Sequence, residues 1–198
     1  MTDPVPAVKT EKAEPEKKGN SAVKEILLFA RDLVICMSIV LVLVNYVIRP
    51  VQVKGTSMYP TLKDKAIGLS NLLGYNMDGI NRFDIVIIYL ENKDEYLVKR
   101  AIGLPGETVS YQDGVLHING EPVEEPFLNS EYRDSYGGRF MSDVSEITLA
   151  DDEYYCLGDN RPASSDSRFY GPFAKDQIIS KGVFILFPFT EFGVKTWW

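Results

Sequence analysis

Ser57 is the first residue whose setting suggests chemistry, because it lies in VKGTSMYPTL (residues 53–62), shortly after a long apolar run. A serine hydroxyl is a weak nucleophile at its own pKa, so covalent catalysis by Ser57 would require a neighbouring base. The usual base is histidine, and the only histidine of the chain is His117, in GVLHING, a pattern typical of a strand that leads into a turn. We therefore interpret His117 as a structural strand residue. A lone histidine is also a poor metal site.

Lys99 is the alternative base, because lysine can accept a proton once it is neutral. Neutrality near pH 7 requires its pKa to fall from about 10.4 to near 7–8, which burial against apolar surface can achieve. Lys99 stands in the apolar stretch YLVKRAIGLPGETV, and strand alternation places it on one face with Leu97 and Ala101. The local pattern fits equally a desolvated base and an edge-strand lysine that protects against aggregation.

A third stretch, LGDNRPASSDSRFYG (residues 157–171), is dense in carboxylates, arginines and serines. Turn-forming polar residues are expected in any loop. Carboxylates and arginines this close together also favour a hydrogen-bonded network. Such a network could hold a hydroxyl against a neutral lysine.

An apolar run precedes these stretches and predicts a transmembrane helix over residues 23–48. Its apolar core, residues 26–48, would span roughly 34 Å as a helix, which is enough to cross a hydrocarbon layer of about 30 Å. Residues 1–22 are rich in Pro, Lys and Glu and are predicted to be a disordered cytoplasmic tail. Basic residues are more frequent before the apolar core than just after it, so the N-terminus is expected inside and residues 49–198 outside. No small residues suited to signal-peptide cleavage follow the core, which favours a permanent, single-pass anchor in the cell membrane.

Residues 49–198 are predicted to form an all-β or mainly β domain. Short β-branched and aromatic runs cover residues 83–90 and 182–189. Residues 106–123 contain two β-like runs joined by an Asp113-Gly114 turn, and an Asn119-Gly120 turn follows.

Composition narrows the partners and cofactors. The 198-residue chain has a formal net charge of −7, which argues against nucleic acid as a partner, since phosphate binding needs a basic face. Neither a metal-ligand cluster nor a phosphate-binding loop is visible in the sequence, so we expect no metal and no cofactor. Cys36 falls in the membrane run and Cys156 in the outer domain, so no internal disulfide is expected.

Four stretches together resemble the conserved boxes of the bacterial type I signal peptidases. They are GTSMYPTL, RFDIVII, YLVKRAIGLPGE and LGDNRPASSDSRFYG, in the family's order behind an anchor, over about residues 26–190. The resemblance implies a mainly β, partly barrel-like catalytic domain of the signal-peptidase and repressor-protease type. It also implies endopeptidase cleavage of signal peptides that carry small side chains before the cut.

The resemblance assigns roles to individual residues. Ser57 would be the nucleophile and Lys99 the general base, and Ser164 would hydrogen-bond the lysine amine. Asp166 and Arg168 would form a supporting pair, and Asp159 would hold the loop.

Residues around the nucleophile are implied to contact the substrate and the oxyanion. The backbone N–H of Ser57 would contribute to the oxyanion hole, helped by backbone donors or by Thr56. Gly55 stands where some family members carry a serine whose hydroxyl helps the oxyanion, and Met58 would line the small-residue pocket. Two further departures are Phe83, in place of the usual glycine, and a short inserted β segment over about residues 107–153, as in compact Gram-positive forms.

The implied partners are secretory preproteins, membrane lipid and a nearby secretion translocon. One alternative is a self-cleaving repressor-type protease, which would carry a DNA-binding module in place of a membrane span. The other is a non-catalytic, membrane-anchored β domain that binds an exported partner, which would fit an exposed Lys99.

Overall fold

The computed structural model describes residues 19–195. The chain divides into two compact units, of which the first ends at Leu41 and the second begins at Val42. Most of the tail expected over residues 1–22 lies outside the described residues. Trp197 and Trp198, which could suit the headgroup level of a membrane, lie outside them as well.

The described part of the first unit consists of the helix α1 (Gly19–Val42) up to Leu41, and a π-helical turn (Leu43–Val47) follows α1 in the chain. Residues 22–47 are long and apolar enough to cross a membrane, with a mean hydropathy of 2.5 in their most apolar window and none of that window buried. The two charges that interrupt the run neutralise each other, because Arg31 Nη2 lies 2.8 Å from Asp32 Oδ1. The helix begins earlier than the predicted residue 23, since no proline separates Gly19 from the apolar run. By length and composition α1 fits a transmembrane anchor.

The larger sheet of the second unit is antiparallel and has the order β1-β2-β11-β3-β4-β9-β10, with β12 paired to β11. Both apolar runs predicted as strands lie in it, in β3 and β11. The prediction of a mainly β domain is confirmed, because two sheets make up most of its regular structure. Among the described residues the larger sheet does not close on itself, so it does not form a closed barrel. Its strands are β1 (Ile48–Gln52), β2 (Ile67–Asn71), β3 (Ile85–Leu90), β4 (Glu95–Gly103), β9 (Glu153–Leu157), β10 (Phe173–Ala174), β11 (Ile178–Phe187) and β12 (Gly193–Lys195).

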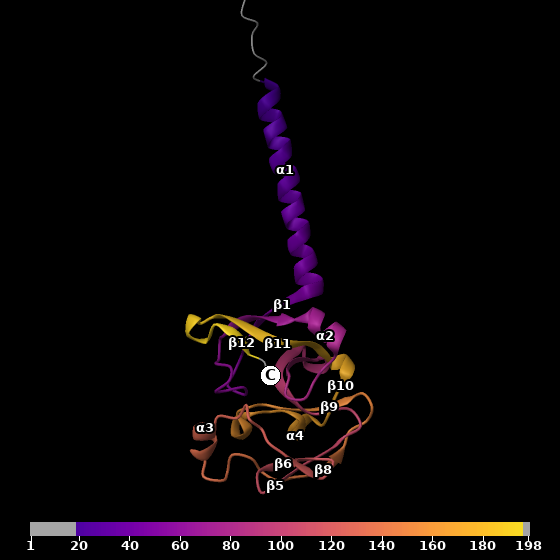
Figure 1. Ribbon diagram of the computed structural model, residues 1–198, viewed down its shortest axis with the longest axis vertical. Helices are drawn as coiled ribbons and strands as arrows, with labels where there is room; N and C mark the ends of the chain where they lie inside the picture. The colour runs from indigo at the N-terminus through magenta and orange to yellow at the C-terminus, as the bar shows by residue number, and fades with distance from the viewer. Residues whose placement is uncertain (1–18, 196–198) are drawn as a thin grey trace, which may run out of the picture. The chain divides into compact units, whose positions relative to one another are not determined.

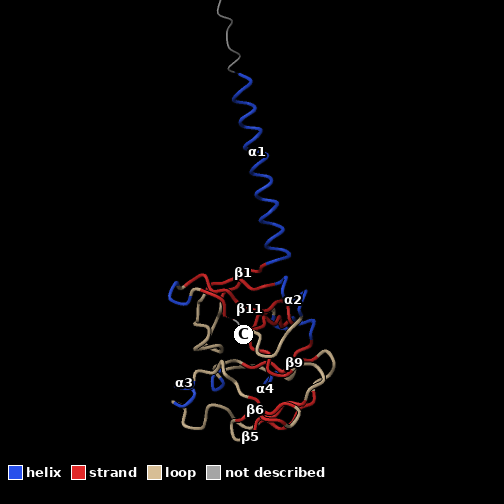
Figure 2. Tube along the Cα trace, viewed as in Figure 1, coloured by secondary structure: helices blue, strands red, loops and turns tan. Residues whose placement is uncertain are grey.

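The smaller sheet falls within the segment 107–153 and has the order β7-β6-β5-β8. Asp113 and Gly114 join β5 to β6 with φ angles of 51° and 77°, the left-handed pair that a tight hairpin turn requires. Within the second unit the two sheets lie apart, with β1, β11 and β12 at one end and β5, β6 and β8 at the other (Figures 1 and 2). Its strands are β5 (Thr108–Gln112), β6 (Val115–Ile118), β7 (Glu121–Val123) and β8 (Val144–Thr148).

Short α-helices connect the strands, and a capping side chain fixes the start of each of the three. Asn71 accepts a 2.7 Å hydrogen bond from the backbone of Gly74. Asn129 accepts a 2.7 Å hydrogen bond from the backbone of Tyr132, and Asp166 accepts one of 3.2 Å from the backbone of Arg168. The α-helices are α2 (Leu72–Asp78), α3 (Ser130–Asp134) and α4 (Ser167–Tyr170). The 3-10 turns are Glu91–Lys93, Arg161–Ala163, Lys175–Gln177 and Phe189–Glu191.

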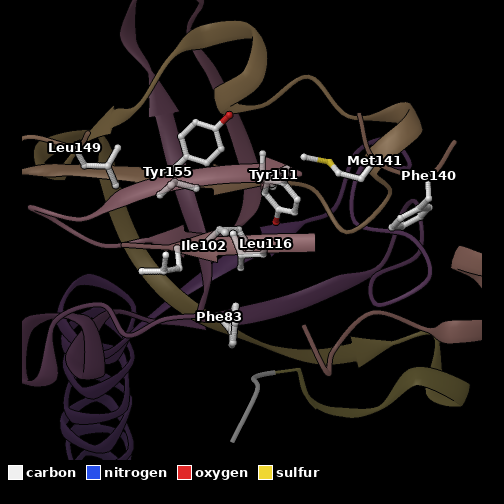
Figure 3. Packing of buried hydrophobic residues seen from close by; sticks show 11 residues of the cluster. Phe83, Ile102, Tyr111, Leu116, Phe140, Met141, Leu149 and Tyr155 are labelled. Atoms are coloured by element: carbon white, nitrogen blue, oxygen red, sulfur yellow. The ribbon is translucent and has the colours of Figure 1, made fainter. Parts of the chain in front are cut away.

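Three apolar clusters hold the second unit together. The cluster that joins the sheets contains Phe83, Ile102, Tyr111 and Tyr155, which point toward a shared interior in Figure 3. A second cluster packs β3 and β4 against β9 and β10. The third cluster contains Met58, so the serine stretch is fastened to the core of the larger sheet.

Candidate active site

Ser57 and Lys99 meet although they are 42 residues apart, because Lys99 Nζ donates a 2.8 Å hydrogen bond to Ser57 Oγ. Lys99 lies in β4, where Val86 of β3 is its partner. Ser57 lies in the turn that follows β1 and is partly exposed. The amine and the hydroxyl are therefore in direct contact at a position that solvent and a ligand can reach.

Burial changes the acid–base character of Lys99, whose residue surface is 2% exposed. Desolvation lowers the pKa of Lys99 from 10.5 to about 8, against the opposing attraction of Asp166. A substantial neutral fraction therefore exists near pH 7–8, as a base requires. The edge-lysine interpretation of Lys99 does not hold, because an edge-strand lysine keeps its amine in solvent.

The serine stretch is held in place by hydrogen bonds to its backbone. Gly55, at φ +84°, donates its N–H to Asp64 Oδ1 over 2.8 Å. Asn160 donates its backbone N–H to the carbonyl of Ser57 and its Nδ2 to the carbonyl of Thr56, both over 3.0 Å. These contacts hold the N–H of Gly55 and the carbonyl of Thr56, which precede the nucleophile, and the carbonyl of Ser57 itself.

Ser164 comes close to the serine stretch but does not bind the lysine. A methyl group on Gly158 would overlap both Ser164 Oγ and the carbonyl oxygen of Ser57, so these two groups flank that glycine. Ser164 Oγ is buried and has no hydrogen-bond partner among the described residues, so the expected bond to Lys99 is not formed. The nearby glycine explains the proximity, because only a residue without a side chain fits between the two.

Asp166 and Arg168 form the expected pair. Arg168 Nε and Nη2 donate to the two carboxylate oxygens of Asp166, each over 2.8 Å. Burial alone would raise the pKa of Asp166, but the charge and hydrogen bonds of Arg168 and the N–H of Gly158 hold it below its usual value. The buried carboxylate remains charged and braces the loop that carries Ser164.

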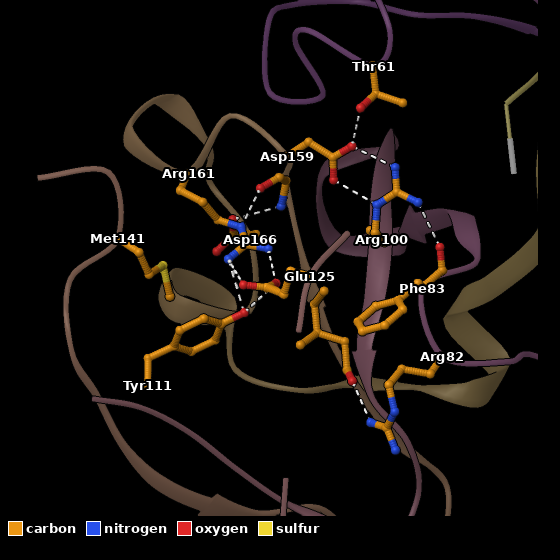
Figure 4. Close-up of polar contacts among 12 residues, drawn as sticks. Thr61, Arg82, Phe83, Arg100, Tyr111, Glu125, Met141, Asp159, Arg161 and Asp166 are labelled. Atoms are coloured by element: carbon orange, nitrogen blue, oxygen red, sulfur yellow. Dashed lines mark hydrogen bonds and ion pairs between the residues drawn. The ribbon is translucent and has the colours of Figure 1, made fainter. Parts of the chain in front are cut away.

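Asp159 holds the loop through two partners that the sequence did not indicate. Its carboxylate accepts two hydrogen bonds from Arg100, of 2.8 and 2.6 Å, and one of 2.6 Å from Thr61 (Figure 4). Arg100 also donates to the carbonyl of Phe83, which adopts φ +71°, a conformation that favours glycine. The Phe83 ring packs 4.9 Å from that of Phe127, which offsets the unfavourable backbone conformation.

A cleft of about 610 Å³ ends at Ser57 and Lys99, with residues 49–54 along one wall and residues 94–99 along the other. Among the described strands, β1 pairs only with β2, so its outer edge is open. Residues 95–99 of β4 pair with β3, while pairing with β9 begins at Arg100. Two unpaired strand edges therefore line the cleft, and Met58, 1% exposed, also lines it.

Other sequence candidates lie outside this cleft. His117 lies in β6, as predicted, and its Nδ1 is 3.1 Å from the carbonyl of Val115. Cys36 and Cys156 are both free cysteines. Within residues 19–195, no group of three or more His, Cys, Asp or Glu side chains could hold a metal ion.

Comparison with known proteins assigns the family. The family model described as signal peptidase, peptidase S26, matches residues 26–187. Signal peptidase IB of Staphylococcus aureus (strain COL) is 34% identical over 179 residues, covering 85% of this chain and 93% of that protein. A signal peptidase I of Bacillus amyloliquefaciens is 36% identical over 179 residues, covering 89% and 96%. A crystal structure of a signal peptidase I from Enterococcus faecalis V583 is 35% identical, with a TM-score of 0.47, and the match covers 52% of this chain and 95% of that one.

The chain belongs to the peptidase S26 family of signal peptidases. The resemblance predicted from the four sequence stretches is confirmed.

Proposed function

We propose that the chain removes signal peptides from exported preproteins through an acyl-enzyme, with Ser57 as nucleophile and Lys99 as general base. Family membership makes it a serine endopeptidase of the signal peptidase I type. The observation that carries the assignment of the two residues is the 2.8 Å hydrogen bond between Lys99 Nζ and Ser57 Oγ.

The proton follows a short path in this proposal. Neutral Lys99 accepts the hydroxyl proton as Ser57 Oγ attacks the scissile carbonyl carbon. The protonated lysine then gives that proton to the amine of the departing mature chain, which leaves an ester on Ser57. Neutral Lys99 then takes a proton from water as the water oxygen attacks the ester carbonyl carbon. Lys99 gives that proton to Ser57 Oγ as the ester C–O bond breaks, which releases the signal peptide as a carboxylic acid and leaves both Ser57 and Lys99 ready for another cycle.

The oxyanion is stabilised by backbone donors in this scheme, with the N–H of Ser57 as the first. Gly55 has no side-chain hydroxyl, and its own N–H is already donated to Asp64. Thr56 is exposed beside the nucleophile and is the remaining candidate for a second donor. One such donor contributes about 10²- to 10³-fold to kcat in serine proteases.

The substrate enters as an additional strand. An extended peptide can hydrogen-bond to the open edges of β1 and β4, a mode in which the backbone supplies affinity and pockets select alternate side chains. Met58 already occupies space in the cleft wall, which favours small side chains next to the cut.

Anchoring in the membrane determines where signal-peptide cleavage takes place in this proposal. We place α1 across the cell membrane as a single span, with the N-terminus in the cytoplasm and residues 49–198 outside. Ser57 follows Arg49 by 8 residues, which bounds its distance from the end of the span at roughly 28 Å. Contact with lipid and a nearby secretion translocon would bring enzyme and substrate into one plane, raising their effective concentration.

The alternative of a non-catalytic anchored binder is less well supported. It fits an exposed Lys99, whereas Lys99 is 2% exposed and in contact with Ser57.

The deciding experiment measures cleavage of a preprotein with an Ala-x-Ala site by the full chain in detergent, comparing wild type with Ser57→Ala and Lys99→Ala. We expect cleavage after the second alanine by wild type only, with both variants folded. Ser110→Ala and Lys175→Ala are matched controls, because neither residue lines the cleft. Cleavage by Lys99→Ala at the wild-type rate would overturn the assignment of the base.

A further inference from the structure

The inserted segment, residues 107–153, reaches the serine stretch through the tyrosine Tyr132 of α3. The Tyr132 hydroxyl donates a 3.1 Å hydrogen bond to Asn160 Oδ1. The same asparagine donates its Nδ2 to the carbonyl of Thr56 and its backbone N–H to the carbonyl of Ser57. A side chain of the inserted segment is therefore two hydrogen bonds from the peptide that carries the nucleophile.

Tyr132 has a second, independent contact with the serine stretch. Its ring meets that of Tyr59 edge to face, with the centroids 5.1 Å apart, and Tyr59 stands two positions after Ser57. The ring contact and the hydroxyl contact act on opposite sides of the nucleophile in the sequence. Both would shift if α3 moved.

The orientation of Asn160 depends on Tyr132. An amide side chain can be reversed end for end, and only one orientation offers Nδ2 to Thr56. A donor held against Oδ1 selects that orientation. Tyr132 is such a donor, and its own hydroxyl lies 3.0 Å from that of Tyr136, which can donate to it in turn.

The Tyr132 hydroxyl keeps its proton over the pH range in which cleavage would be measured. Desolvation, helped by the hydrogen bond with Tyr136, raises the pKa of Tyr132 to about 12. The hydroxyl therefore remains a donor at any pH at which Lys99 can act.

We infer that Tyr132 is a positioning residue of the active site, which orients Asn160 and thereby holds Ser57 Oγ within reach of Lys99. The inference rests on Ser57 being the nucleophile. It gives the inserted segment a part in catalysis, although none of residues 107–153 lines the cleft.

Tyr132→Phe tests the hydroxyl alone, because phenylalanine keeps the ring contact with Tyr59. We expect kcat to fall roughly 3- to 10-fold, the size of one lost hydrogen bond, with KM unchanged. Acylation of Ser57 by a serine-reactive β-lactam, a probe without peptide contacts, should slow by the same factor. Tyr136→Phe should cause a smaller fall, since the bond from Tyr132 to Asn160 remains.

Tyr75→Phe is the matched control, because its hydroxyl makes one 3.3 Å bond to the carbonyl of Lys175 and Tyr75 does not line the cleft. It should leave kcat and acylation unchanged. A double-mutant cycle then asks whether Tyr132 acts through Asn160: in an Asn160→Ala background, Tyr132→Phe should cause no further loss. Urea unfolding of each variant separates loss of stability from loss of rate.

Three results would overturn the inference. The first is an unchanged kcat for Tyr132→Phe with only its stability lowered. The second is an equal loss in Tyr75→Phe, and the third is a full additional loss in the Asn160→Ala background. The single variants decide the matter even if Asn160→Ala does not fold. Ser57→Ala in the same assay separates the two proposals, because activity in that variant would refute the nucleophile itself.

Discussion

Arg100 and Asp159 form a buried ion pair joined by two parallel hydrogen bonds, with side chains 2% and 1% exposed. Each partner adjoins a residue of the site: Arg100 follows Lys99 in β4, and Asp159 follows Gly158 in the loop beside Ser164. The pair therefore fixes the strand that carries the proposed base to the loop that flanks the proposed nucleophile.

Removing one partner of this pair should be costly. Asp159→Ala leaves the Arg100 guanidinium buried without its counter-charge, which destabilises a fold by about 3–5 kcal/mol. The free energy of unfolding in urea measures this loss. Asp134→Ala is the control, because its ion pair with Arg133 is exposed and such pairs contribute about 0–1 kcal/mol. Equal losses in the two variants would contradict the structural role of Asp159.

The rate should depend on pH through Lys99. The base must be neutral, and its pKa is about 8, so kcat/KM should fall tenfold per pH unit well below pH 8 and level off above it. A pH profile of preprotein cleavage checks this. A rate that stays constant down to pH 5 would exclude a lysine base with this pKa.

Lys99 should also reduce stability at neutral pH. Its pKa is lower in the folded protein, about 8, than the ordinary 10.5, so between these values the unfolded chain binds the proton that the native one lacks. Stability from this group therefore decreases as pH falls from 10.5 to 8 and remains low below that. At 1.36 kcal/mol per unit, Lys99→Met should stabilise the protein at pH 7 by up to about 3 kcal/mol. Urea unfolding at pH 7 and pH 10.5 tests this, since the gain should be small at the higher pH.

At position 83 a glycine variant should be more stable than an alanine variant, the reverse of the usual order. Its φ of +71° disfavours any residue with a Cβ by roughly 1–2 kcal/mol, a cost that glycine avoids. Both Phe83→Ala and Phe83→Gly lose the buried ring, at about 3–5 kcal/mol. The glycine variant should nevertheless be the more stable of the two, as judged by urea unfolding.

Phe173 provides the comparison, because it is also a buried phenylalanine but lies in the strand β10 and does not have a positive φ. At that position glycine should be less stable than alanine by about 0.5–1 kcal/mol. The same order at both positions would show that the backbone of Phe83 is not strained.

The sequence predicts much of this architecture from local patterns. β-branched runs mark β3 and β11, and Asp113-Gly114 marks the β5–β6 hairpin, because alternation and turn chemistry are local properties. The pairing of Ser57 with Lys99 follows only from the resemblance to the signal peptidases, because no local pattern relates residues 42 positions apart.

Residues that act through tertiary contacts escaped prediction. Strand alternation places Arg100 on the face of β4 opposite Lys99, and only the fold reveals its pairing with Asp159. Asn160 is one polar residue among many in its loop, and Tyr132 lies in a segment with no motif. Ser164 was expected to bind Lys99, but its Oγ lies buried beside Gly158 without a partner among the described residues.

Arg161 has a consequence for protein engineering. This buried residue begins the 3-10 turn Arg161–Ala163, in the loop that also carries Ser164 and Asp166. Its guanidinium contacts Glu125 and Tyr111 of the inserted segment, and its carbonyl accepts a 2.8 Å hydrogen bond from Arg168. A shortened enzyme that lacked residues 107–153 would retain every residue that lines the cleft. It would also expose the guanidinium of Arg161. Because the carbonyl of Arg161 holds Arg168, the pair between Arg168 and Asp166 would lose support as well. The smaller sheet is therefore not a detachable module, and a minimal version of this protease must keep it or replace Arg161.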